Sequence, residues 1–246
     1  MPKISFVMPQ KNRGGRIHKS IRSIIDQTEN DWELIIVDDH SDQGDQTERV
    51  INEFNDKRIV YAKMPHKWPS GIPNARNFGN MFATASIIAV TDSDDINKAR
   101  RAEITLEYFN KEKCDVFFGN YEIYKEKSNE LIEPKYKIDK FKAEMMNERN
   151  YISHASSAYK REIAYMFPYN SFFGKGEDYD LFMRLLTANK KFSYSKEVVF
   201  RYVVHGGNIS GGGSIEAVDN LIKLNNHIIE YNRDDLLKDF INDVYN

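Results

Sequence analysis

The sequence lacks the features that would mark a membrane-spanning or disulfide-stabilised protein. It has one cysteine, Cys114, among 246 residues, so no disulfide can form within the chain, which fits a reducing compartment. Cys114 precedes an apolar run, and we expect a buried thiol there. No uncharged apolar run approaches the roughly 20 residues needed to span a bilayer, and the amino terminus has no signal-peptide pattern. We therefore expect a cytoplasmic chain with at most peripheral contact to the inner face of the membrane.

An excess of one charge is also lacking. The chain has 35 basic and 37 acidic side chains, which give a formal net charge of −2. This balance disfavours a general nucleic-acid surface. The 41% of hydrophobic residues are enough for a sizeable core, and the length suits one large α/β domain or two small ones.

In the first half, strand and helix patterns alternate along the chain. This rhythm predicts a largely parallel, doubly wound sheet flanked by helices. The expected strands cover residues 4–8, 33–37, 58–62 and 86–90, and the expected helices cover 15–27, 47–54 and 74–85.

The second half is less regular. Its last 32 residues, 215–246, are predicted to form an acidic amphipathic helix, which anionic lipid would repel. We expect this helical tail to pack on the core or on a second copy in a homodimer. Before the tail, the expected elements are a helix over 100–110, a strand over 115–124, a loop with short helices over 125–150, a strand over 152–159, a helix over 178–189 and an extended segment over 192–204.

Three acids follow the buried strand 86–90. Asp92, Asp94 and Asp95 leave that strand at the carboxyl edge of the sheet, where open α/β sheets bind ligands. Hard oxygen ligands suit Mg²⁺ or Mn²⁺, which usually arrive with a phosphorylated substrate. The alternative is a solvated acidic turn that caps the next helix. The motif alone leaves both interpretations open.

Three more clusters lie at predicted strand or helix ends in the first half. The loop around Lys11 to Gly15 could hold a phosphate or a base, although it lacks the ending of a P-loop. Asp38 and Asp39 could accept hydrogen bonds from a base or a ribose. Arg76 could neutralise a diphosphate. Each has an ordinary alternative: a βα turn, a helix cap and a solvated surface residue.

The last cluster lies in the second half. Glu177 and Asp178 begin a predicted helix, where acids are favoured by the helix dipole. Asp178 could instead be a general base that takes a proton from an attacking hydroxyl. His205 ends an apolar strand, where a lone histidine is more often structural than a ligand. Read together, the clusters predict one active site.

The order and spacing of these motifs resemble glycosyltransferase family 2 over residues 3–210. The motifs that carry the resemblance cover residues 23–28, 31–41, 75–77, 91–95 and 176–181. The resemblance implies a single GT-A domain over 1–214, with a nucleotide-sugar-binding half at 1–98 and an acceptor-binding half at 99–214. It also implies an inverting transferase that uses a nucleotide-sugar donor, most often a UDP-sugar, with Mn²⁺ or Mg²⁺. The acceptor would be a hydroxyl of a glycan or of a lipid-linked sugar.

The resemblance also implies residue roles. Asp94 would contact the metal, with Asp92 and His205 as further candidate ligands. Asp178 would be the catalytic base in a single in-line displacement, and Glu177 would contact the acceptor or brace the loop. Asp95 keeps the structural role. The residues expected to contact the nucleotide sugar are Pro9, Asn12, Arg13, Asp38, Asp39, Arg76, Asp92 and Ser93.

The sequence departs from the family pattern in three loops. Lys11 precedes Asn12 where the family usually has tyrosine, and the segments 96–100 and 170–175 also differ. These loops bear on the donor sugar and the acceptor, so neither is specified. Two other functions remain as alternatives. One is a nucleotidyltransferase, which also places acids around a metal, and the other is a non-catalytic sugar-binding module of the same fold.

Overall fold

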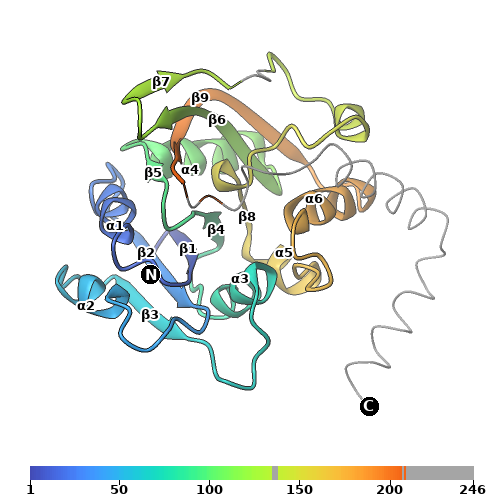
Figure 1. Cartoon of the computed structure of the whole chain (residues 1–246). Helices are drawn as coiled ribbons and strands as arrows, with labels where there is room; N and C mark the ends of the chain where they lie inside the picture. The colour runs from blue at the N-terminus through green and yellow to red at the C-terminus, as the bar shows by residue number, and fades with distance from the viewer. Residues whose placement is uncertain (135–137, 207, 209–246) are drawn as a thin grey trace. The chain divides into compact units, whose positions relative to one another are not determined.

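The first half of the chain forms a parallel sheet with the strand order β3-β2-β1-β4 (Figure 1). The chain fills one side of β1 first and then returns to its other side with β4. The winding direction therefore reverses between β1 and β4, and open α/β sheets bind ligands outside the carboxyl ends of the strands at such a point. The four strands are β1 (Ile4–Gln10), β2 (Trp32–Asp38), β3 (Ile59–Lys63) and β4 (Ile87–Val90).

Helices cover both faces of this sheet, which explains its nearly continuous apolar strands. Helix α1 (Ile17–Ile25) buries Ile17 and Ile21 in one core cluster with Phe6 of β1. Helix α3 (Ile72–Asn80) packs against β1 and β2. It approaches them so closely that a Cβ atom on Gly79 would lie 2.6 Å from Val7 Cγ1 and 2.7 Å from Val37 Cγ2. Only glycine permits this close approach.

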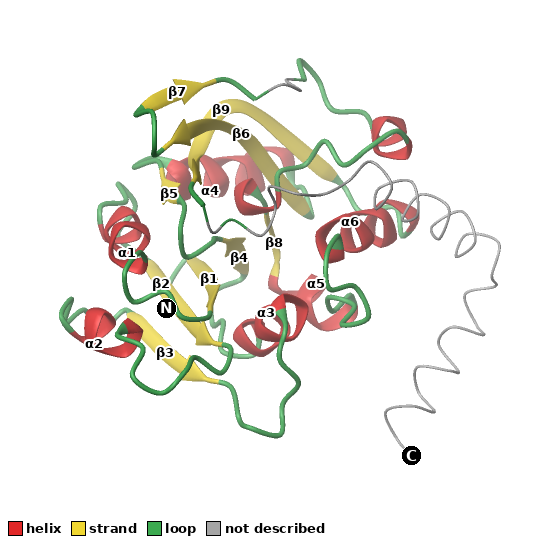
Figure 2. Cartoon of the chain, in the orientation of Figure 1, coloured by secondary structure: helices red, strands yellow, loops and turns green. Residues whose placement is uncertain are grey.

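The second half extends the same sheet in the order β4-β8-β6-β9-β5, with β7 paired to β6. Strand β8 is antiparallel to both β4 and β6, whereas β6 and β9 are parallel. Figure 2 shows helices on both sides of the strands, and the expected α/β fold is confirmed. The remaining elements are α2 (Thr47–Asn52), β5 (Ile96–Asn97), α4 (Arg101–Glu112), β6 (Val116–Lys125), β7 (Glu130–Ile132), η1 (Ala143–Asn147), η2 (His154–Ser156), β8 (Ala158–Lys160), α5 (Arg161–Met166), α6 (Glu177–Thr187) and β9 (Phe192–Val204).

The computed structural model describes residues 1–134, 138–206 and 208. Residues Met1–Asn208 form one compact unit. The predicted helical tail over 215–246, and the homodimer contact proposed for it, lie outside the described residues. Within the described part, no helix is both long enough and apolar enough to cross a membrane.

The expected strand over 152–159 is wrong in its first part. The structure has the 3-10 helix η2 there, and only β8 is extended. Two serines explain the difference: Ser156 Oγ donates to the Ser153 carbonyl and Ser157 Oγ donates to the His154 carbonyl, both at 2.7 Å. Such local side-chain bonds compete with strand pairing.

The other differences concern short elements and helix ends. The expected helix over 74–85 begins earlier, at Ile72, because Pro73 suits the first helical turn, and it ends at Asn80. Strands β5 and β7 and helix α5 were not expected, because two to six residues carry too little periodicity to detect. Cys114 is buried, as predicted.

A buried cation joins the two halves of the sheet beneath the carboxyl end of β4. Arg101 is 1% exposed, and its guanidinium donates to the carbonyls of Val90 and Ser157 and to Asn97 Oδ1. Burial lowers the pKa of Arg101 to about 9, so it is still charged at neutral pH. It therefore fixes the end of β4, from which the acidic loop begins.

Replacing Arg101 by methionine should cost about 3 kcal/mol or more of unfolding free energy, because it strands buried acceptors without a donor. Urea denaturation measures the loss. The neighbouring Arg100 is the matched control, because its side chain is 52% exposed and bridges Glu103 and Glu197. Its methionine variant should lose no more than about 1 kcal/mol. Equal losses in the two variants would contradict the role given to Arg101.

Candidate active site

The loops that follow β1 and β4 meet at the switch point of the sheet. Arg13, in the first loop, places Nη2 3.6 Å from Asp94 Oδ2 in the second. The two loops are held close because the Thr91 amide donates to the Val7 carbonyl at 3.2 Å. The structure thus brings two of the predicted donor-site residues into one ion pair.

A third chain segment reaches the same point from the end of β9. Asp95 is 2% exposed and accepts a hydrogen bond of 2.9 Å from the Val203 amide, which agrees with the structural role expected for it. Burial, with the charge of Asp92, raises the pKa of Asp95 well above its usual range. The bond places His205 beside the acids, with Nε2 3.1 Å from Asp94 Oδ2.

Asp94 and His205 are the pair that could hold a divalent cation. Among the described residues there is no group of three or more His, Cys, Asp or Glu side chains placed to bind a metal. Two protein ligands are nevertheless enough for Mg²⁺ or Mn²⁺ when substrate phosphates and water complete the coordination, and carboxylate with imidazole suits Mn²⁺. The donor set therefore fits the expected ion.

Asp92 is engaged in a different contact. Its Oδ1 accepts a hydrogen bond of 3.0 Å from Arg76 Nη2, and Arg76 Nε lies 3.9 Å from Glu177 Oε1. Arg76 is 5% exposed, so it is not the solvated surface residue that was the alternative. Burial lowers the pKa of Arg76, but the negative charges, Asp92 first, outweigh that effect and raise it. The cation joins the sheet edge to the start of α6.

Helix α6 begins at the two predicted catalytic acids. Gly176, directly before it, has φ 83°, in the left-handed region that favours glycine. Glu177 is 7% exposed, and burial raises its pKa to about 7, although Arg76 opposes the shift. Asp178 is partly exposed, and burial raises its pKa as well. Both carboxyl groups are therefore better proton acceptors than ordinary acids.

One contact of Asp178 was not predicted. Asn150 Nδ2 donates to Asp178 Oδ2 at 3.0 Å across 28 residues of sequence. Asn150 ends a charged stretch without clear periodicity, and nothing in its local pattern could have indicated this contact.

On the side that is predicted to bind the nucleotide, Asp39 faces the loop between β3 and α3. Its Oδ2 accepts the Gly71 amide at 2.9 Å, and its Oδ1 lies 3.2 Å from His40 Nδ1. His40 Nε2 in turn lies 3.1 Å from the Pro65 carbonyl. Asp39 thus organises the loop that lies beside the predicted base site.

Two other residues expected to contact the nucleotide have hydrogen bonds within the protein. Asp38 accepts the Ser41 amide at 2.9 Å and the Tyr61 hydroxyl at 2.6 Å. Asn12 exchanges two hydrogen bonds with Asp42, at 2.7 and 2.8 Å. The Asn12–Asp42 bonds tie the loops after β1 and β2 together.

Ser93 and Pro9 also differ from exposed loop residues. Ser93 is 5% exposed. Pro9 does not lie in the loop after β1, as the sequence led us to expect; it lies within β1 and pairs with Val37. Strand β4 pairs with β1 only as far as Val7, so the missing N–H of Pro9 falls where one neighbour is absent.

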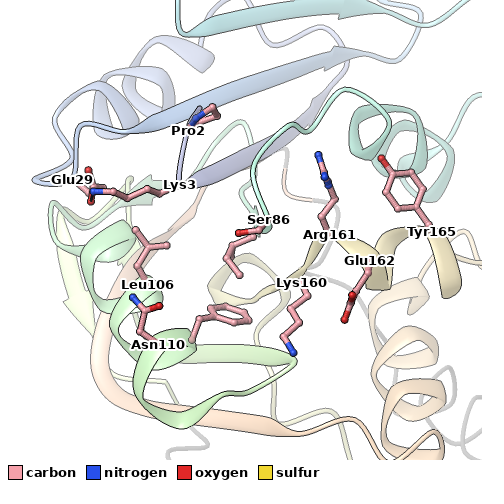
Figure 3. Close-up of a pocket in the computed structure, with 12 residues that line it drawn as sticks. Pro2, Lys3, Glu29, Ser86, Leu106, Asn110, Lys160, Arg161, Glu162 and Tyr165 are labelled. Atoms are coloured by element: carbon pink, nitrogen blue, oxygen red, sulfur yellow. Dashed lines mark hydrogen bonds and ion pairs between the residues drawn. The ribbon is translucent and has the colours of Figure 1, made fainter.

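A separate pocket of about 850 Å³ lies at the opposite, amino-terminal edge of the strands (Figure 3). Lys3 precedes β1, Ser86 precedes β4, and Arg161 and Tyr165 belong to α5. None of the predicted site residues is among the described residues that line it. The acids at the carboxyl edge, not this pocket, therefore form the candidate active site.

Solved structures define the class of fold. Staphylococcus aureus TarS, residues 1–349 in complex with UDP-GlcNAc, matches with a TM-score of 0.73 and 16% identity, over 91% of this chain and 66% of that chain. The TarS 1–349 complex with UDP matches with a TM-score of 0.64, also at 16% identity, over 82% of this chain and 60% of that chain. The fold is therefore the GT-A glycosyltransferase fold.

Sequence comparison then identifies the family. WfgD, a UDP-Glc:α-D-GlcNAc-diphosphoundecaprenol β-1,3-glucosyltransferase of Escherichia coli, is 36% identical over 49% of this chain and 46% of its own length. The uncharacterized glycosyltransferase MJ1057 of Methanocaldococcus jannaschii is 30% identical over 82% of this chain and 70% of its own length. Residues 5–166 match Glycosyl transferase family 2. The chain belongs to this family, and its class is that of the glycosyltransferases.

A third relative extends the comparison to a poly(ribitol-phosphate) transferase. TarP of Staphylococcus aureus strain N315, a poly(ribitol-phosphate) β-N-acetylglucosaminyltransferase, is 34% identical over 49% of this chain and 37% of its own length. The matched segment spans less than half the length of WfgD and of TarP.

The raised pKa of Glu177 predicts a pH-dependent contribution to stability. The folded protein keeps the Glu177 proton up to a pH of about 7, whereas the ordinary value is 4.5. Between pH 4.5 and 7, Glu177 releases its proton in the unfolded state but keeps it in the folded state. Raising the pH over this range therefore stabilises only the unfolded state, and the free energy of unfolding falls. Relative to Glu177→Gln, the parent should lose at most about 3 kcal/mol of unfolding free energy across it.

Urea denaturation of both proteins at several pH values between 4 and 8 measures this difference. The control is Glu162→Gln, because Glu162 is exposed on α5 and water solvates its carboxylate in both states. That variant should follow the parent at every pH. If the stability difference between the parent and Glu177→Gln did not change with pH, the assignment would be contradicted.

Proposed function

We propose that this chain transfers a sugar from a nucleotide-diphosphate sugar to a hydroxyl of a glycan or of a lipid-linked sugar. The single observation that supports this most is the Arg76 bridge. Through it, Asp92 at the end of β4 and Glu177 at the start of α6 lie on one guanidinium, at 3.0 and 3.9 Å. This bridge supports a single site in which Asp92 serves the donor and Glu177 the acceptor.

The proposed reaction is a single displacement with Asp178 as general base. Burial raises the pKa of Asp178, which favours proton acceptance from the acceptor hydroxyl. The acceptor oxygen attacks the anomeric carbon as the bond to the diphosphate breaks on the opposite face. Anomeric configuration is therefore inverted, and the products are the glycosylated acceptor and a nucleoside diphosphate.

The diphosphate leaving group would face Arg13 and Asp94 at the switch point. Arg13, 3.6 Å from Asp94 Oδ2, supplies positive charge from the loop after β1. Asp94 and His205 would hold Mn²⁺ or Mg²⁺, which when bound offsets the negative charge of the leaving group. Asp92, already bonded to Arg76, would orient the donor.

The relatives support a UDP-sugar as donor. The name of WfgD gives UDP-Glc as its donor, and TarS has been crystallised with UDP-GlcNAc and with UDP. The names of WfgD and TarP give a diphosphoundecaprenol-linked sugar and a poly(ribitol-phosphate) as acceptors. Acceptors of these classes are the first to test.

A donor screen tests the proposal and the metal together. UDP-, GDP- and dTDP-sugars are incubated with the protein and acceptor, with Mn²⁺, with Mg²⁺ or with EDTA. We expect release of the nucleoside diphosphate from one class of donor, its loss in EDTA and its recovery with added cation. Release of pyrophosphate would instead indicate a nucleotidyltransferase. Binding of every donor without turnover would indicate a sugar-binding module, and full turnover in EDTA would contradict the metal.

Asp178→Asn tests the base. This change keeps the shape of the side chain but removes its proton-accepting oxygen, so transfer should fall by about 10²- to 10⁴-fold. Folding and donor binding, followed by circular dichroism and calorimetry, should match the parent. Arg184, whose guanidinium bonds Asp180 four residues earlier in α6, supplies the control Arg184→Lys on the same helix. Near-parent transfer by Asp178→Asn would remove Asp178 from this role.

A further inference from the structure

We infer that Asn150 is a positioning residue for the general base, an inference that rests on the proposed function. Asn150 lies between η1 and η2, outside regular secondary structure. It bonds Asp178 through Nδ2 at 3.0 Å. It would act through that carboxylate and would not itself contact the substrate.

The orientation of the Asn150 amide is fixed by a second bond. Its Oδ1 accepts a hydrogen bond of 3.0 Å from the Ile152 amide. If the amide were flipped, an oxygen would face the Asp178 carboxylate and an NH₂ group would face an N–H donor. Both contacts would then be lost. The side chain can therefore only donate to Asp178.

The segment that carries Asn150 is held on both sides. Before it, the buried Met146 accepts a hydrogen bond at its carbonyl from the hydroxyl of Tyr179, the residue after the base. After it, Ile152 is 2% exposed, and His154 Nε2 lies 2.9 Å from the Tyr169 hydroxyl. A donor anchored in this way is preorganised, so little ordering is needed when it binds a charged carboxylate.

The bond also acts on the proton affinity of the base. Burial raises the pKa of Asp178, whereas the Tyr179 amide, the charge of Arg76 and the Asn150 amide oppose that shift. Among the described residues, the charged groups that act on Asp178 include Arg76 of α3 and Glu177 of its own helix. Asn150 thus favours the ionised form that can accept a proton, in an orientation that does not depend on the substrate.

Two substitutions separate positioning from a purely local role. Asn150→Asp keeps the oxygen that accepts the Ile152 amide but turns the donor that faces Asp178 into a like charge. Asn150→Ala removes both contacts. If Asn150 positions the base, the aspartate variant is the more damaged of the two. If it only shapes its own turn, the alanine variant is the more damaged.

The first readout is the pH dependence of kcat for donor turnover. Loss of a hydrogen bond to a charged group should lower kcat about 10-fold at the acid end of the profile in Asn150→Ala, and more in Asn150→Asp. This loss of kcat should become smaller toward alkaline pH, because a higher pKa of Asp178 moves the acid limb of the profile to higher pH. KM for the donor should change little. The control is Asp56→Asn, because Asp56 Oδ1 accepts the Arg58 amide at 2.9 Å in the same type of turn; its acid limb should stay in place.

A second readout does not need turnover. Protein labelled with ¹³C at aspartate carboxyl groups is titrated by NMR, and the Asp178 signal is assigned by its loss in Asp178→Asn. Its pKa should rise in Asn150→Ala and rise further in Asn150→Asp. If the parent turns over a donor and the Asn150 variants fold, but the pKa of Asp178 in these variants equals that in the parent, this inference is overturned and the proposed function is not. No turnover by the parent with any donor would overturn the proposed function and, with it, the catalytic role of Asn150.

Discussion

A buried guanidinium must be compensated by hydrogen-bond acceptors or by nearby negative charge, and this constraint shapes the centre of the molecule. Arg76 is 5% exposed and lies between Asp92, which follows a strand of the first half, and Glu177, which begins a helix of the second. Removal of either acid would leave the cation undercompensated. These charges therefore also connect the first and second halves of the chain. A substitution that removes one of them would affect both the site and the packing of the fold.

Much of this arrangement could be predicted from local pattern. A parallel strand covered on both faces is a short run of apolar residues, and β1, β2, β4 and β9 all lie close to where such runs occur. Polar residues that follow these strands must meet at one sheet edge. That rule is enough to bring Arg13, Asp94 and His205 together. It works because each residue lies within a few positions of a strand end.

What could not be predicted depends on contacts between distant segments. The burial of Arg76 requires α3, β4 and α6 to be placed first. Asn150 reaches Asp178 across 28 residues, and no periodicity marks it. The segment over 152–159 has the composition of a strand, yet serine side chains bonded to their own backbone turn its first part into a 3-10 helix. In each case tertiary or side-chain interactions outweigh the local preference.

The lack of a Cβ atom at Gly79 has a consequence for the position of Arg76. Gly79 lies one helical turn after Arg76, and its missing side chain lets α3 rest directly on Val7 and Val37. The distance between α3 and the sheet determines how far the Arg76 guanidinium extends toward Asp92 and Glu177. A methyl group at this position would lift the helix and shorten that reach, although it touches no substrate and alters no charge. The position of the Arg76 guanidinium is therefore determined by the distance between α3 and the sheet as well as by the acids that it contacts.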